Sequence, residues 1–233
     1  MWEEFLRIMA ECGHHAAAVS VRGHGMSQGR QALGSATLAQ YVADILRALS
    51  EFSEPPIVIA HSLGALLAQR LLGRTAIRAL VMLAPLPPEG MLLISGRLMV
   101  TAPETWLEII DTILGFRAPS LGKLKELTFS DRFAAVDVDR HLDRMVIESM
   151  AVLLELHVPL LIPPACSLGV PTLVIAGDAD RLVPSEFAWR TAMYHGAEFI
   201  SVSGFGHLLH LEPGADHIAK MTIRWLEQRG LLF

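Results

Sequence analysis

The sequence predicts an α/β fold in which a mostly parallel sheet is flanked by helices and carries a helical cap insertion. Three observations lead to this prediction. Apolar runs of strand length alternate with segments whose apolar residues recur at helical spacing. The chain is 52% hydrophobic and only 18% charged, which suits strands that are buried on both faces. Residues 85–167 interrupt the alternation and are proline-rich at both ends.

The first third of the chain contains two predicted helices and one predicted strand. Residues 2–11 have apolar side chains at helical spacing, and Gly13 ends this helix. Residues 16–21 form an apolar run of strand length, and a glycine-rich loop follows at residues 22–27. Residues 37–50 predict a second amphipathic helix.

The remaining elements repeat this alternation around the interrupted stretch. Residues 57–60 predict a buried strand that runs directly into a helix ending near residue 72. Three more strands are predicted at residues 77–84, 171–176 and 198–202, and a last helix at about 215–228. We interpret residues 1–84 and 168–233 as the core. Residues 85–167, with helical pieces around 104–114 and 141–156, are interpreted as a cap packed over one edge of the sheet.

Ser62 is the first candidate for chemistry, because it lies between a buried strand and an apolar helix. A sharp turn of this kind exposes the hydroxyl and brings it close to backbone N–H donors. Ala60 and Gly64 are the small residues expected to let the turn close, so the pattern is A-x-S-x-G. The alternative is that Ser62 only caps the helix that begins at Leu63, a frequent use of serine.

An acid and a base follow the later strands. Asp178 and Asp180 come after the strand at 171–176, at the edge where parallel sheets bind ligands. Either acid could instead be an ordinary loop residue, and Asp178 follows Gly177 as a turn-capping residue would. His207 follows the last strand in a glycine-flanked loop, with His210 as a supporting residue. Most of the ten histidines are expected to be structural or solvated.

With Ser, Asp and His in this order, the chain resembles the α/β-hydrolase fold superfamily, especially small esterase-like and lipase-like members. The resemblance covers nearly the whole chain. It implies that Ser62 is the nucleophile, that Asp180 rather than Asp178 is the acid, and that His207 is the base. It also implies that residues 85–167 are a cap that shapes the substrate pocket.

The sequence departs from this family in two places. Ser20 stands where the family usually has an aspartate two residues before Arg22, a position that we interpret as structural. The family's first hairpin and the strand ending in His-Gly, which supplies one oxyanion donor, have no counterpart here. The backbone N–H of Leu63 is then the one assignable donor. Three explanations are open: native N-terminal residues are missing, which we favour, or the sheet closes differently, or a partner fills the gap.

The resemblance implies hydrolysis of a carboxylic ester, or a related acyl bond, of a small and largely apolar substrate through an acyl-enzyme on Ser62. We expect His61, Met91 and Leu92 to bind the substrate, although the apolar side chains of the cap could equally serve only to pack it. The alternatives are a thioester or C–C bond hydrolase of the same fold, or a non-catalytic ligand-binding member. No cofactor and no metal are expected.

Composition excludes several other classes. A net charge of −5 without a basic cluster argues against nucleic acid as a partner. No apolar run is long enough to span a membrane, and Glu3 and Glu4 stand where a signal peptide would be basic. The two cysteines, Cys12 and Cys166, show neither disulfide nor zinc spacing, so a reducing, cytoplasmic setting is expected. The oligomeric state is left open, with a homodimer as one option.

Overall fold

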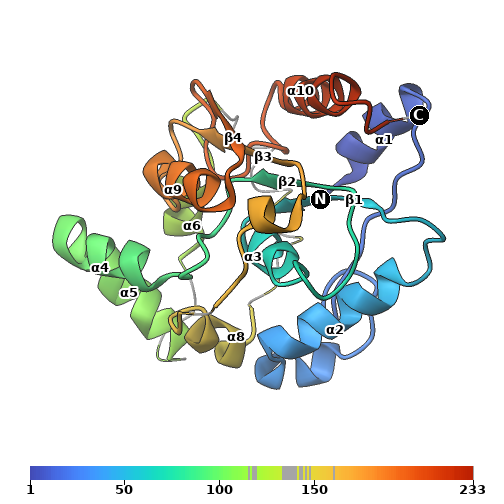
Figure 1. Ribbon diagram of the computed structural model, residues 1–233. Helices are drawn as coiled ribbons and strands as arrows, with labels where there is room; N and C mark the ends of the chain where they lie inside the picture. Colours follow the sequence, from blue (N-terminus) through green and yellow to red (C-terminus); the bar gives the residue numbers. More distant parts are fainter. Residues whose placement is uncertain are drawn as a thin grey trace.

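The computed structural model describes residues 1–114, 116, 120–132, 141, 144, 146, 148–159 and 161–232, with Leu121 described by its backbone alone. Its centre is a parallel sheet in the order β1-β2-β3-β4 (Figure 1). The strands are β1 (Ile57–His61), β2 (Ala79–Leu83), β3 (Thr172–Gly177) and β4 (Glu198–Val202). Ile59 pairs with Val81, Met82 with Val174, and Ile175 with Ile200. The predicted parallel α/β fold is confirmed.

Alternate residues of each strand enter two separate apolar cores, one on each face of the sheet. Leu80 and Val174 face the side covered by α2 (Leu38–Leu49), α3 (Leu63–Gln69) and α9 (Ser185–His195). Val81 and Leu173 face α1 (Glu3–Glu11) and α10 (Ala215–Glu227), which pack against each other (Figure 1). Because β2 and β3 are buried throughout, their sequences are apolar without alternation. Full burial of each large aliphatic side chain contributes about 1.5–3 kcal/mol.

The helices begin and end where local chemistry favours it. A capping box starts α2, since the Thr37 hydroxyl accepts from Gln40 N and the Gln40 side chain accepts from Thr37 N. Helix α9 ends at Gly196, whose φ of 61° closes the helix in the left-handed conformation. Of the strands and helices named so far, the sequence predicted all except α9.

The predicted strand at residues 16–21 is wrong. The chain is irregular there, and residues 16–20 are exposed. Strand β1 pairs with β2 on one side, and none of the described residues forms a strand on its other side. An apolar run becomes a strand only when a neighbour accepts its backbone hydrogen bonds. With no described strand beside it, the segment at 16–21 lacks that neighbour.

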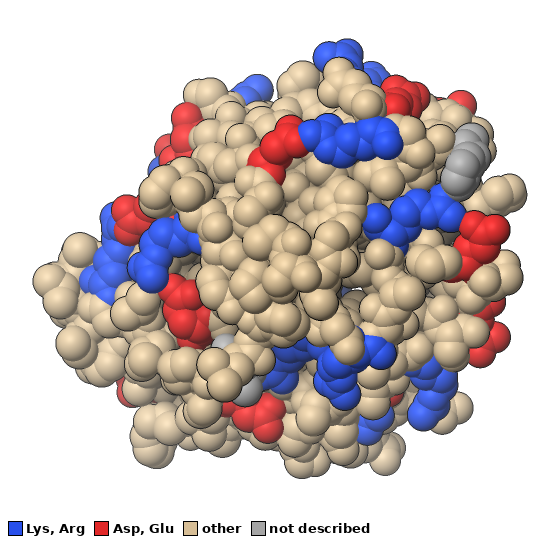
Figure 2. All heavy atoms as spheres, in the orientation of Figure 1, with Lys and Arg blue, Asp and Glu red and all other residues tan. Residues whose placement is uncertain are grey.

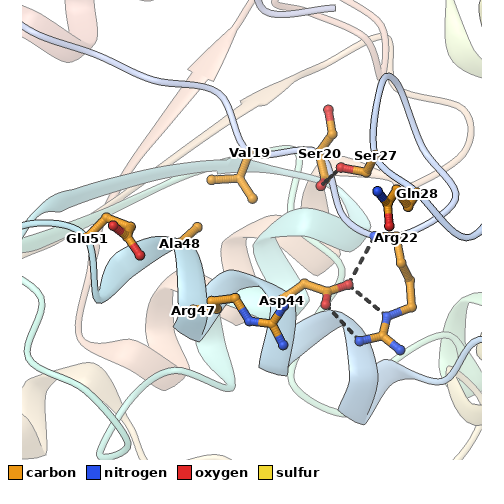
Figure 3. A pocket seen from close by; sticks show the side chains of 9 residues that line it. All are labelled: Val19, Ser20, Arg22, Ser27, Gln28, Asp44, Arg47, Ala48 and Glu51. Carbon is orange, nitrogen blue, oxygen red and sulfur yellow. Dashed lines mark hydrogen bonds and ion pairs between the residues drawn. The ribbon is translucent and has the colours of Figure 1, made fainter.

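The loop that follows is held by an ion pair instead. Arg22 donates to Asp44 of α2 from Nε (2.9 Å), Nη2 (2.8 Å) and its backbone N–H (3.0 Å; Figure 3). The Ser20 carbonyl accepts from the Ser27 hydroxyl at 2.6 Å. These residues line a surface cavity of about 400 Å³ together with Val19, Gln28 and one face of α2. An acid on α2 thus supplies Arg22 with the carboxylate that position 20 lacks.

Between β2 and β3 the chain forms α4 (Leu92–Thr101), α5 (Pro103–Ile113), α6 (Leu121–Thr128) and α8 (Met150–Glu155). Helices α4 and α5 pack together beside α9, whereas α8 lies nearer to α2 (Figure 1). The predicted helix at 104–114 corresponds to α5. Part of the predicted helix at 141–156 corresponds to α8, while residues 142, 143, 145 and 147 lie outside the described residues.

The chain also forms two short 3₁₀ helices, η1 (Arg30–Ser35) and η2 (Ala165–Leu168). None of the helices formed by the described residues is long and apolar enough to cross a bilayer.

Candidate active site

Ser62 lies in the turn between β1 and α3 with φ 51° and ψ −120°, a conformation that non-glycine residues rarely adopt. Such a backbone costs on the order of 1–3 kcal/mol and persists only where neighbouring contacts hold it. Here Ser62 N donates to Leu83 O at 3.0 Å, and Ser62 O accepts from Ala65 N at 3.0 Å. The Ser62 side chain makes no capping hydrogen bond to α3, so helix capping does not explain this serine.

The Ser62 hydroxyl instead contacts His207, which in turn contacts Asp180. The distance from Ser62 Oγ to His207 Nε2 is 2.7 Å, and that from His207 Nδ1 to Asp180 Oδ2 is 2.8 Å. Because a carboxylate only accepts, His207 Nδ1 carries the proton and its Nε2 is free to accept from Ser62. His207 and Asp180 are both buried. The three residues singled out by motif and chain order therefore lie in a hydrogen-bonded row.

The two acids of the loop after β3 do different things. Asp180 Oδ1 accepts from Leu182 N at 2.9 Å and from Val183 N at 2.8 Å, which leaves Oδ2 for His207. Asp178 lies toward β4, where it accepts from Gly204 N and from the Ser203 hydroxyl. Only Asp180 of the pair contacts the histidine, and its backbone donors hold it in that orientation.

Two further histidine rings, those of His61 and His210, lie beside this row. His61, directly before Ser62, lies 4.8 Å from the His207 ring and 4.4 Å from the His210 ring, centroid to centroid. Its Nε2 donates to the His207 carbonyl at 2.8 Å. Burial holds the pKa of His61 well below its usual range and lowers that of His210 to about 3, and His207 adds to both shifts. Both flanking rings are therefore neutral near pH 7.

Helix α1 closes one side of this cluster. The Trp2 indole stacks on the His210 ring at 4.7 Å with an interplanar angle of 26°. The nitrogen Nδ1 of His210 is buried and has no hydrogen-bond partner among the described residues. A stacked, unpaired imidazole is easier to bury when it is uncharged, which agrees with its low pKa.

Gly64 was expected to let the turn at Ser62 close, but the structure requires glycine at Gly177 instead. A Cβ added at Gly64 would meet nothing within 4 Å among the described residues, so this turn does not require glycine there on steric grounds. At Gly177 an added Cβ would lie 2.0 Å from Phe205 O, because the loop after β3 (residues 178–184, the acid loop) and the loop after β4 (residues 203–212, the histidine loop) pass each other closely. The Leu63 N–H donates no hydrogen bond to the described residues and remains available to a ligand.

The predicted substrate-binding residues are not gathered together. His61 is packed between two other histidines, Met91 donates its N–H to Leu156 O, and the exposed Leu92 begins α4. A separate cavity of about 500 Å³ lies between helices α4 to α6 and the loop after β3, where Ile94, Leu98, Arg181 and Asp180 line part of it. The substrate-binding assignment stays a prediction. The described residues contain no cluster suited to a metal ion.

The surface around the core carries no large field of one sign on the face drawn in Figure 2. Basic and acidic side chains are interspersed there around a broad uncharged area. Among the described residues, charged side chains form ion pairs such as Arg190 with Glu89 and Lys123 with Glu126. This distribution gives no support to a nucleic-acid surface on that face.

Glu212 and Trp2 were not assigned any part in the site by sequence analysis. The Glu212 carboxylate is buried and accepts from Gly206 N in the histidine loop. The sequence places Glu212 five residues after His207, but no neighbouring residue indicates that its distant partner is Ser130. Trp2 looked like an ordinary apolar residue of a surface helix, and only the tertiary structure brings it to His210.

Comparison with known proteins agrees with this fold. The structure is similar to an extracellular alpha/beta-hydrolase from a Paenibacillus species (TM-score 0.75, 15% identity, covering 96% of this chain and 92% of that one). It is also similar to an esterase from Exiguobacterium antarcticum (TM-score 0.74, 16% identity, 97% and 86% covered). A third is the Paleococcus ferrophilus monoacylglycerol lipase (TM-score 0.64, 16% identity, 97% and 88% covered). No curated protein matches the chain. The model of the alpha/beta hydrolase family matches residues 1–219, and the chain belongs to that family.

Proposed function

We propose that the protein is a serine hydrolase that cleaves a carboxylic ester through an acyl-enzyme on Ser62. One observation carries the proposal: the row from Ser62 Oγ through both nitrogens of His207 to Asp180, with contacts of 2.7 and 2.8 Å. A serine hydroxyl is a weak nucleophile by itself, and an adjacent oriented base is what activates it. The similarity to an esterase and a lipase supports the same reading.

The reaction follows from these contacts in two steps. His207 Nε2 takes the proton of Ser62 as Oγ attacks the ester carbonyl, and the same proton then goes to the departing alcohol. Water enters, gives a proton to His207 and attacks the acyl-enzyme, which releases the acid and returns the proton to Ser62. Asp180 stays ionised throughout and stabilises the imidazolium that forms twice in each cycle.

The neutral histidines around the base favour this cycle. When His207 becomes positively charged, a second charge on His61 or His210 would repel it at ring distances below 5 Å. Burial keeps both flanking rings uncharged, so among the described residues the charge that would face the imidazolium of His207 is the carboxylate of Asp180. The positive charge that forms on His207 is therefore balanced by the Asp180 carboxylate and is not opposed by a charge on His61 or His210.

Leu63 N–H is the donor that we assign to the developing oxyanion, because it is the first amide after the nucleophile and is unpaired among the described residues. One donor of this kind contributes about 10²–10³ in kcat. A family member that kept the triad but bound its ligand without turnover would retain this geometry, so the experiment must test turnover directly.

We infer that the substrate is small and largely apolar and that residues 85–167 form the cap that shapes its pocket. Helix α4 supplies apolar residues at the surface, including Leu92, Leu93 and Met99, and the cavity beside Asp180 is partly lined by this helix. We also propose a reducing, cytoplasmic setting, which the free and exposed Cys12 and Cys166 support.

A fluorophosphonate probe together with chromogenic esters of increasing acyl length tests the proposal. We expect labelling at Ser62 and turnover of short esters, both lost in Ser62→Ala and both retained in Ser203→Ala, which removes a nearby serine hydroxyl that binds Asp178. Including an acyl thioester and a β-diketone separates ester hydrolysis from the thioester and C–C alternatives. No labelling and no turnover would identify a non-catalytic member and reject the proposal.

A further inference from the structure

Glu212 joins two segments that are far apart in the sequence. The residue is only 3% exposed. Oε1 accepts from Gly206 N at 3.1 Å, next to His207, and from Ser130 N at 2.7 Å. Oε2 accepts from the Ser130 hydroxyl at 2.6 Å. One buried side chain therefore ties the histidine loop to the segment that follows α6.

Other contacts reinforce the same junction. Leu208 N donates to Thr128 O at 3.0 Å, and the Leu208 side chain packs with Phe129 in a small apolar cluster. The two backbones approach so closely that a Cβ at Gly206 would lie 2.6 Å from Ser130 N. The histidine loop is thus held from both sides, since His61 also binds the His207 carbonyl at 2.8 Å.

The end of α6 and the residues that follow it also reach the loop that carries Asp180. Arg181 donates to the Glu126 carbonyl at 3.3 Å and forms an ion pair with Asp131 at 2.8 Å. We call residues 126–131 the brace. Arg181 connects the brace to the acid loop, and Glu212 connects it to the histidine loop. The brace therefore joins the two loops that carry Asp180 and His207. The spacing of these loops sets the distances along the row from Asp180 through His207 to Ser62.

We propose that Glu212 is a positioning residue of the active site and that it holds His207 Nε2 within reach of Ser62 through the brace. The inference rests on the proposed hydrolase function, because it assigns Glu212 a part in that reaction. Glu212 touches neither Ser62 nor the His207 ring among its hydrogen bonds, so it acts only through Gly206 and Ser130. A misplacement of about 1 Å in such a site can cost about 100-fold in rate.

Two substitutions separate hydrogen bonding from bulk. Glu212→Ala leaves the N–H groups of Gly206 and Ser130 and the Ser130 hydroxyl without their acceptor. We expect it to lower kcat by roughly 10- to 100-fold with little change in KM, as for a group that acts on geometry rather than on binding. Glu212→Gln keeps an oxygen for the two N–H groups, and its NH₂ can donate to the Ser130 oxygen. It should therefore restore most of the lost rate.

Glu148→Ala is the matched control. Glu148 is another largely buried carboxylate, and it accepts from the Tyr41 hydroxyl and from Ser149 N, both at 2.6 Å. Glu148 Oε2 also lies 3.4 Å from His24 Nε2, and within the described part of the chain none of these partners belongs to the loops that carry Asp180 and His207. We expect this variant to lose stability while keeping kcat. Equal loss of kcat in Glu148→Ala and Glu212→Ala would mean that general destabilisation, not positioning, explains the effect and would overturn the inference.

A spectroscopic measurement makes the test independent of turnover. The proton between His207 Nδ1 and Asp180 should give a low-field proton resonance, identified by its loss in His207→Ala. We expect this resonance to broaden or shift in Glu212→Ala and to be preserved in Glu212→Gln and Glu148→Ala. An unchanged resonance together with unchanged kcat in Glu212→Ala overturns the inference. A wild-type protein with the resonance but no turnover rejects the proposed hydrolase activity instead.

Should Glu212→Ala fail to fold, Ser130→Ala replaces it. This variant deletes only the hydroxyl that donates to Glu212 Oε2 and keeps the Ser130 N–H contact. We expect a smaller effect, about three- to tenfold in kcat, accompanied by a shift of the same resonance. If neither kcat nor the resonance changes in Ser130→Ala, the proposed link between the brace and His207 is wrong.

Discussion

His207 in the proposed catalytic row and His195 at the end of α9 are both buried, and each has hydrogen-bond partners at both ring nitrogens. The partners differ in kind. His207 lies between a carboxylate and a hydroxyl, so its Nε2 is free to take a proton from Ser62. His195 Nδ1 accepts from Ala165 N at 3.1 Å, so its proton is on Nε2, which donates to Gln69 Oε1 at 3.0 Å.

The network around His195 has no position left for a second proton. Gln69 uses its own NH₂ group to donate to Ala65 O and Leu86 O, which joins α3 to the chain after β2. Burial lowers the pKa of His195 to about 4, so the ring is neutral near pH 7. Burial is thus common to both histidines. The two differ in what their neighbours donate or accept: His207 has a nitrogen that can take a proton, as the proposed base requires, whereas His195 cross-links two segments.

The largest expected effect comes from replacing each histidine by alanine. His207→Ala should lower kcat/KM on the order of 10⁴-fold or more with a smaller change in unfolding free energy. His195→Ala should do the reverse, because it leaves Ala165 N–H and Gln69 Oε1 buried without partners, at about 1–3 kcal/mol each. Ester kinetics and urea unfolding of both variants measure this. Similar losses of activity in the two variants would contradict the division of roles.

The two acids of the loop after β3 provide the next test. Asp180→Asn removes the charge that orients His207 and stabilises its imidazolium, and we expect kcat to fall by about 10³–10⁴-fold. Asp178→Asn is the control, because the hydrogen bonds that Asp178 makes to described residues are with Gly204 N and Ser203 at the neighbouring turn. It should keep kcat within about threefold of wild type. A larger loss in Asp178→Asn than in Asp180→Asn would exchange their assignments.

The residues of the candidate site differ in how far the sequence could predict them. Ser62, Asp180 and His207 each follow a strand that the apolar pattern identified, so topology brought them to one edge of the sheet. The choice of Asp180 over Asp178 came from resemblance alone. Its structural basis, the N–H groups of Leu182 and Val183, depends on the exact path of the loop.

Long-range partners could not be predicted at all. Glu212 meets Ser130 across 82 positions and His195 meets Gln69 across 126, and nothing in the local pattern marks either pair. The predicted strand at residues 16–21 failed for the related reason that strand formation depends on a neighbour, not only on the run itself. Local pattern predicted elements and their ends, whereas pairing between distant segments required the structure.

The buried, neutral ring of His195 should make the protein less stable at low pH. A histidine whose folded pKa is about 4, against 6.5 in the unfolded chain, binds fewer protons when folded. The stability that His195 contributes is therefore fully present above about pH 6.5 and is lost as pH falls toward about 4. The free energy of unfolding lost in this way is at most about 3 kcal/mol. Unfolding in urea from pH 7 to pH 4 measures this. His195→Asn, which keeps an acceptor but does not titrate, should show a smaller pH dependence than wild type.

The smallest expected effect distinguishes positioning from substrate binding at His61. Its Nε2–H holds the His207 carbonyl at 2.8 Å, so His61→Phe keeps a ring between His207 and His210 but removes the donor. We expect kcat to fall by about tenfold with KM nearly unchanged, and His61→Gln to recover part of the loss through its amide N–H. The reverse pattern, a raised KM with kcat unchanged, would show that His61 contacts the substrate. Because His61 is the residue before Ser62, a kcat effect would mean that the nucleophile turn itself helps to set the position of the base.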